Sequence, residues 1–235
     1  FPMTAMDEII TRTPDALFNG SAGAQLFQSC VPNIKEPWVI PQVDIDMLFT
    51  AIRIASYGHE MEMTVSCPHC NEPQDYALDL RNVIDQYGSP DFSKKLTIDD
   101  LEIFFRPLNY HEISESAQKQ FEQQKRIQLT SEAENVTDEQ KLKAMSEALT
   151  EVTKMTMNTM NESVQSVSIN GQIVEDRQQI NEFMQNIDRK LFKTIQDHLT
   201  SIRGQSEMKP LQITCKECNT GFEQPFTLDM SNFFV

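Results

Sequence analysis

The chain has 235 residues, of which 39% are hydrophobic, so it can bury a sizeable core in one large domain or two small ones. Its 35 acidic residues outnumber 20 basic ones, and the net charge of −15 repels DNA phosphates and anionic lipid alike. The sequence contains neither a run of about 18 apolar residues nor a signal-peptide pattern. We therefore expect a soluble intracellular protein that neither binds nucleic acid nor spans a membrane.

Residues 1–66 are predicted to form a mainly helical segment that leads into a strand. Thr13 followed by Pro14 is a helix-start signal, because proline suits the first helical position. Three prolines within residues 31–41 then favour an extended connection, since proline lacks a backbone donor and restricts the residue before it. Trp38, the only tryptophan, is expected to anchor this connection.

A further helix is predicted over residues 44–57, where apolar side chains recur at helical spacing. Asp44 or Asp46 is expected to cap its first turn, and Gly58 is expected to end it in a left-handed conformation. The pattern then predicts strands on either side of the first cysteine pair, at residues 60–66 and 76–80.

The middle of the chain contains two predicted hairpins. Residues 96–106 are typical of a hairpin with Asp99 and Asp100 at its turn. Asn170 and Gly171 predict a second hairpin, because this dipeptide favours a type I′ turn. Helical patterns lie between the two hairpins and after the second one, at residues 111–128, 138–160 and 176–202.

Two of these helices, at 138–160 and 176–202, have a clear apolar face. In the helix at 138–160, this face is lined by Leu142, Met145, Leu149, Val152 and Met155. The helix at 176–202 is predicted as one long element, capped by Asp176 and ended by Gly204.

The acidic, glutamine-rich residues 114–139 are expected to be a solvated helix face with a linker, or alternatively an interaction arm.

Four of the five cysteines form two C-x-x-C pairs. The first pair is Cys67 and Cys70, and the second is Cys215 and Cys218. Each pair follows an apolar residue and a hydroxyl residue, and each precedes an asparagine. This internal repeat predicts two matching knuckles related by a pseudo-twofold axis.

The two cysteine pairs together suit a metal ion. Two thiolates in one tight turn can chelate an ion, and two such turns complete a tetrahedral shell that Zn²⁺ accepts without geometric penalty. Because four thiolates leave no position for water or substrate, the predicted metal is a structural zinc. The alternatives are an iron–sulfur cluster, a redox pair, or reduced cysteines in a core.

The predicted fold class is α+β, namely a split Cys₄ zinc ribbon with small antiparallel strands and a large, mainly helical insertion. The metal is expected to hold the two ends of this insertion together. We divide the chain into an N-terminal helical segment, a first knuckle with a hairpin, the insertion, and a second knuckle with a C-terminal strand, at residues 1–66, 67–108, 109–204 and 205–235.

Nothing in the sequence indicates catalysis. It lacks a Walker A loop, a G-x-G-x-x-G element and a G-x-S-x-G elbow, and its histidines share no metal-binding motif. Cys30 is expected to be an ordinary thiol, and His69 is not expected to replace a sulfur ligand. Asp99 and Asp100 are explained by the hairpin turn, without an acid–base role. We assign no catalytic residue and expect no enzymatic activity.

Five segments carry a further pattern: TPDALFNG at 13–20, CVPNI at 30–34, DIDML at 44–48, AIRIASYG at 51–58 and CPHC at 67–70. These segments resemble the baseplate hub subunit family of T-even-type contractile-tailed bacteriophages. The resemblance is strongest over residues 13–80 and weaker through the RPLNY segment at 106–110 and the second knuckle.

The resemblance implies a non-enzymatic protein that helps to build the baseplate hub at the tip of the tail tube. Its partners would be other phage baseplate and tail proteins, and it would be made in the host cytoplasm before it joins the virion tail. Two other functions stay open. One is a zinc-ribbon regulator that contacts nucleic acid or a polymerase, for which Lys216 is the main basic residue near a knuckle. The other is a metal-dependent hydrolase, which needs an open coordination position.

Overall fold

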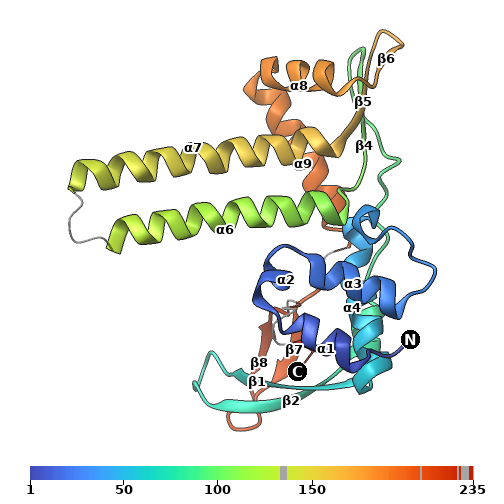
Figure 1. The fold of residues 1–235 in the computed structure, drawn as a ribbon, viewed down its shortest axis with the longest axis vertical. Helices are drawn as coiled ribbons and strands as arrows, with labels where there is room; N and C mark the ends of the chain where they lie inside the picture. Colours follow the sequence, from blue (N-terminus) through green and yellow to red (C-terminus); the bar gives the residue numbers. More distant parts are fainter. Residues whose placement is uncertain (133–136, 207, 227, 229–232, 235) are drawn as a thin grey trace. The chain divides into compact units, whose positions relative to one another are not determined.

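The computed structural model describes residues 1–132, 137–206, 208–226, 228 and 233–234. The chain forms two compact units (Figure 1). Unit 1 comprises Phe1–Pro90 with Arg203–Val235, and unit 2 comprises Asp91–Ile202. Helices and small antiparallel sheets occur in both units, which confirms the predicted α+β class. The predicted division into four segments stays a prediction.

Unit 1 begins with a group of helices packed around aromatic side chains. Phe27 stacks on Phe49 with ring centroids 4.6 Å apart, and Phe49 meets Phe234 edge-on at 6.1 Å. All three side chains are almost fully buried, so a residue near the end of the sequence completes a core built by its beginning. The helices are α1 (Ala5–Thr11), α2 (Pro14–Phe18), α3 (Ser21–Cys30), the 3₁₀ helix η1 (Pro37–Val39) and α4 (Gln42–Tyr57).

Helix α4 differs from its prediction at both ends. It begins after Pro41, so Asp44 and Asp46 lie inside the helix and the predicted aspartate cap is wrong. The fixed φ of proline, −58° here, suits the entry to a helix and makes an aspartate cap unnecessary. Gly58 has the predicted positive φ of 89°, but its ψ of 176° is extended rather than left-handed helical.

The same helix holds the last described residues of the chain. The Arg53 Nε donates to the Phe233 carbonyl oxygen at 3.0 Å, and the Tyr57 hydroxyl donates to the Phe234 carbonyl oxygen at 3.4 Å. The guanidinium carbon of Arg53 also lies 4.5 Å from the centroid of the Tyr57 ring. Polar and aromatic contacts therefore fix Phe233 and Phe234 against α4.

Two antiparallel hairpins complete unit 1. β1 (Glu60–Ser66) pairs with β2 (Pro73–Asp79), and β7 (Leu211–Thr214) pairs with β8 (Gly221–Gln224). β1 has the predicted bounds, whereas β2 begins three residues before the strand predicted at 76–80. β2 ends one residue early because the Asp79 side chain accepts the N–H of Arg81 at 2.9 Å and caps the short helix α5 (Leu80–Ile84).

Unit 2 contains a four-stranded antiparallel sheet with the order β3-β4-β5-β6. Both predicted hairpins are confirmed: Asp99 lies at the β3–β4 turn with φ of 50°, and Asn170 and Gly171 form the β5–β6 turn with φ of 51° and 81°. The strands are β3 (Leu96–Ile98), β4 (Leu101–Phe105), β5 (Val164–Ile169) and β6 (Gln172–Val174).

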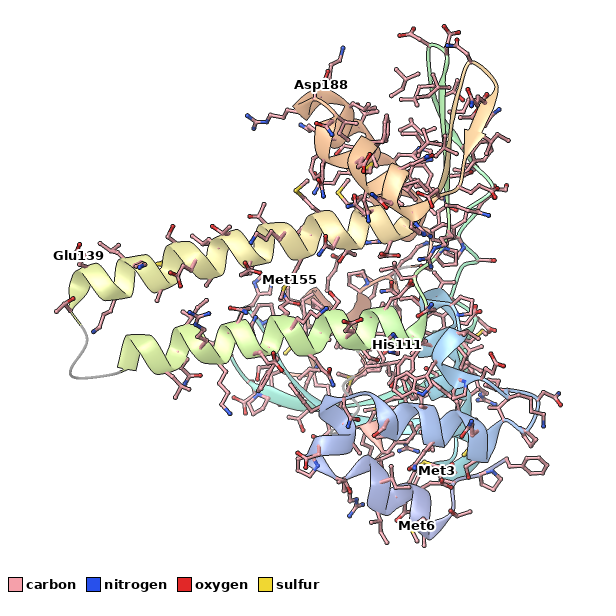
Figure 2. The ribbon with its side chains drawn as sticks, turned by 45° about the horizontal axis from the view of Figure 1, so that its top comes forward. Met3, Met6, His111, Glu139, Met155 and Asp188 are labelled. Carbon is pink, nitrogen blue, oxygen red and sulfur yellow. The ribbon has the colours of Figure 1, made fainter. Side chains whose placement is uncertain are left out.

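Two long helices, α6 (Tyr110–Glu132) and α7 (Asp138–Ser163), lie side by side and extend away from this sheet (Figure 1). They confirm the predicted helices at 111–128 and 138–160. We call this pair of helices the arm. Figure 2 marks His111 near the start of α6, and Glu139 near the start of α7, at the end of the arm that lies away from the sheet. In the part of the chain that the structure describes, no helix is long and apolar enough to cross a membrane.

The single long helix predicted at the end of unit 2 is wrong. The chain forms two helices there, α8 (Arg177–Asn186) and α9 (Arg189–Arg203). Asp176 caps α8 as predicted, but Ile187 is extended, and the Asp188 carboxylate accepts the N–H of Leu191 at 2.7 Å. A second capping aspartate therefore starts a new helix although the apolar spacing continues. Both helices contribute to one core, which includes Ile103, Phe105, Val164, Ile180 and Ile195.

A close backbone approach joins the two chain segments of unit 1. A Cβ atom built on Gly88 would lie 2.1 Å from the backbone oxygen of Gln205, whereas one on Gly221 would have no atom within 4 Å. We predict that Gly88→Ala lowers the free energy of unfolding by about 1–3 kcal/mol, because backbone must shift. Urea unfolding measures this, with Gly221→Ala as the matched control. Equal stability of the two variants would contradict this contact.

Candidate metal centre

The first C-x-x-C pair lies in the loop that connects β1 to β2. The N–H of Cys67 donates to the Glu72 carbonyl oxygen at 3.1 Å, and the N–H of Asn71 donates to the Cys67 carbonyl oxygen at 2.8 Å. Asn71 adopts a positive φ of 59°, which asparagine tolerates better than most residues with a side chain. The loop is thus closed by its own backbone, with both sulfur-bearing residues inside it.

The second pair repeats this arrangement between β7 and β8. The N–H of Cys215 donates to the Thr220 carbonyl oxygen at 3.0 Å, and the N–H of Asn219 donates to the Cys215 carbonyl oxygen at 3.0 Å. Asn219 has φ of 57°, nearly the value of its counterpart in the first loop. The asparagine after each cysteine pair therefore has a conformational reason, and it closes both knuckles in the same way.

The two loops bring all four sulfur atoms together. Cys67 Sγ lies 3.7 Å from Cys218 Sγ, Cys70 Sγ lies 3.6 Å from Cys215 Sγ, and all four atoms lie within 4.8 Å of one another. A disulfide needs about 2.05 Å, so these contacts are not disulfides. A tetrahedral shell with metal–sulfur bonds of about 2.3 Å has edges of about 3.8 Å. The cluster can therefore hold one metal ion.

Burial and electrostatics divide the cluster into two halves. Cys67 and Cys215 are buried, whereas Cys70 and Cys218 are exposed. Hydrogen bonds from the Thr220 side chain and backbone lower the pKa of Cys218 to about 6. A backbone hydrogen bond at Glu72 lowers the pKa of Cys70, but burial and the neighbouring thiols outweigh it and raise the pKa to about 12. A metal that binds the four sulfur atoms must displace the protons that they carry, because only thiolates bind the ion.

The other residues weighed in the sequence lie outside this cluster. Cys30 is buried at the end of α3. His69 lies within the first knuckle, where its backbone N–H donates to Cys67 Sγ at 3.4 Å. His198 is in unit 2, where its Nε2 lies 3.0 Å from the Lys94 carbonyl oxygen. No local pattern indicates the role of Gln74, whose side chain hydrogen-bonds to the backbone of the second knuckle.

Unit 2 has a cleft of about 550 Å³ between α6 and α7, and its lining includes Met155, which Figure 2 marks. Three carboxylates line it, and each is in an ion pair. Arg106 contacts Glu112 at 2.6 Å and Glu162 at 3.1 Å, and Lys119 contacts Glu115 at 2.5 Å. Burial raises the pKa of Glu112, but the hydrogen bonds from Arg106 and the Asn109 backbone, together with nearby positive charge, outweigh this and hold the pKa below its usual value. These pairs explain the carboxylates as structural.

Comparison with known proteins identifies a family. The family model described as T4 bacteriophage base plate protein matches residues 3–235, nearly the whole chain. The chain belongs to this family. No curated protein matches significantly, and neither does any solved structure. Family membership makes this a phage tail baseplate protein and implies contacts with other tail proteins.

We predict that the chain purified under reducing conditions contains one metal ion per molecule. Cys67→Ser or Cys215→Ser should abolish stoichiometric binding, because each removes a buried ligand, while Cys30→Ser should retain it. Acidification should release the ion, since the ligands must be thiolates. Inductively coupled plasma mass spectrometry measures the metal content. A folded, metal-free chain with four reactive thiols at neutral pH would refute the site.

Proposed function

We propose that the chain is a non-enzymatic subunit of the baseplate hub, stabilised by one structural Zn²⁺ at Cys67, Cys70, Cys215 and Cys218. The observation that carries the proposal is the family match over residues 3–235. The chemistry of the four clustered sulfur atoms supports the zinc part, since thiolate ligands suit Zn²⁺. Sulfur atoms bound to different irons of a cluster would lie farther apart than 4.8 Å, so the geometry favours a single ion.

The same geometry argues for a structural rather than a catalytic ion. A four-sulfur shell leaves no position for water, which a metal-dependent hydrolase requires. The nucleic-acid alternative has little support at the knuckles. The Lys216 Nζ donates to the Asp75 carbonyl oxygen at 2.8 Å, and the chain as a whole has a net charge of −15.

The arm supports a role in contacts with other baseplate proteins. On α7, four apolar side chains follow the three-four-three spacing of a helix-packing seam, and all are exposed: Leu142, Met145, Leu149 and Val152. Leu142 and Leu149 have 69% and 59% of their surface exposed, whereas Ala148 on the side toward α6 is buried. We propose that this stripe packs against an α-helix of another baseplate protein. This stripe lies on α7, outside residues 114–139, for which the sequence left an interaction arm open.

Location in the particle tests the hub assignment. We propose that the protein is made in the host cytoplasm and then becomes part of the virion tail baseplate. Purified tails should contain it, and electron microscopy of tails with a labelled chain should place the label at the centre of the baseplate. Label at the baseplate periphery would contradict the hub assignment, and absence from finished tails would restrict the protein to assembly.

We predict that Leu149→Glu weakens incorporation into baseplates by roughly tenfold or more, because burial of one leucine contributes about 2 kcal/mol. Thr150→Glu is the matched control, since it adds the same charge to the adjacent exposed position. Circular dichroism and metal content should be unchanged in both. Quantitative immunoblots of purified tails measure incorporation, and equal amounts of the two variants would argue against the stripe as an interface.

A further inference from the structure

The side chain of Gln74, on the β1–β2 hairpin, forms hydrogen bonds with the backbone of the second knuckle. Gln74 lies on β2, opposite Val65. Its Oε1 accepts the N–H of Lys216 at 2.8 Å, and its Nε2 donates to the Thr214 carbonyl oxygen at 3.4 Å. Thr214 and Lys216 are the neighbours of Cys215 in the sequence, so one amide holds the backbone on both sides of a buried sulfur ligand.

The pseudo-twofold repeat does not supply a second contact of this kind. Ile213 pairs with Phe222 as Val65 pairs with Gln74, so an apolar and buried ring takes the place of the glutamine. The counterpart of Lys216 is Pro68, which has no N–H to donate. The Gln74 contact therefore runs from the first hairpin to the second knuckle only, although the two knuckles repeat each other in other respects.

We propose that Gln74 is a positioning residue of the metal centre, an inference that rests on the proposed metal site. Each knuckle fixes its own two sulfur atoms through backbone hydrogen bonds, but those bonds do not set one knuckle against the other. Gln74 does so, and the Lys216 Nζ bond to the Asp75 carbonyl oxygen adds to it. In this arrangement the Cys215 Sγ lies 3.6 Å from the Cys70 Sγ.

Outer groups that orient metal ligands typically change metal affinity by about 10–100-fold. We expect Gln74→Leu to weaken Zn²⁺ binding by about tenfold, because the knuckles must then be ordered by the ion itself. Gln74→Glu keeps the acceptor for the Lys216 N–H and loses the donor to Thr214, so its affinity should lie between those of Gln74→Leu and the wild type. Competition with a chromophoric chelator measures these affinities on the full chain.

The matched control is Gln212→Leu. Gln212 also has an exposed amide on a hairpin strand, but its Nε2 donates to Glu223 Oε1 at 2.9 Å within its own hairpin. This variant should bind Zn²⁺ like the wild type. Co²⁺ absorption gives a second readout, because the thiolate-to-metal bands of Gln74→Leu should shift or broaden if Cys215 is less well placed.

The outcomes separate the two claims. If the wild type and all three variants bind Zn²⁺ with equal affinity and give equal Co²⁺ spectra, the positioning role of Gln74 is wrong and the metal site stands. A wild-type chain that binds neither ion overturns the metal site itself. Should Gln74→Leu fail to fold, Gln74→Glu decides alone, and wild-type affinity for that variant would overturn the inference.

Discussion

The constraint on which unit 1 depends is the meeting of two hairpins that lie far apart in the sequence. Contacts between sulfur atoms join residues separated by 151 and 145 positions. Closing a loop of this length costs about 5 kcal/mol in chain entropy, whereas a structural zinc site supplies about 10–16 kcal/mol in small peptides. One ion can therefore offset the closure with a surplus, which no surface ion pair of the protein could do.

Around this joint, other contacts tie the same two segments of unit 1 together. Phe234 enters the aromatic core of the first helices, and the backbone at Gln205 packs directly against Gly88. All of unit 2 lies between the hairpins in sequence and has its own core around Ile103 and Ile195. This arrangement separates two tasks: unit 1 closes the chain on itself, and unit 2 carries the arm with its exposed apolar stripe. A baseplate subunit needs both a stable body and a surface for its neighbours.

Local rules predicted most elements and the candidate site, because the signals were local. Asn170–Gly171 predicted its hairpin, and the repeated C-x-x-C motif predicted that Cys67, Cys70, Cys215 and Cys218 would come together. Local rules failed where two signals competed. At Asp188 the apolar spacing favoured one continuous helix, but a capping side chain divided it.

Apart from the cysteine cluster, contacts between remote residues left no local pattern from which to predict them. Nothing in the sequence indicated that Phe234 would pack on Phe49 or that Gln74 would bracket Cys215. The asparagine after each cysteine pair belongs to the repeat that predicted two matching knuckles, and its physical reason is that Asn71 and Asn219 both adopt the positive φ that closes a knuckle. The repeated asparagine indicates that the two loops share a backbone conformation as well as a pair of cysteines.

The central claim is that one ion joins the two hairpins, and anomalous diffraction at the zinc absorption edge tests it most directly. Crystals of the full chain grown without added metal should give one peak, about 2.3 Å from each of the four sulfur atoms. A peak with fewer sulfur neighbours and a bound water would contradict a structural ion. Disulfides between the cysteines, with no anomalous peak, would contradict the metal centre altogether.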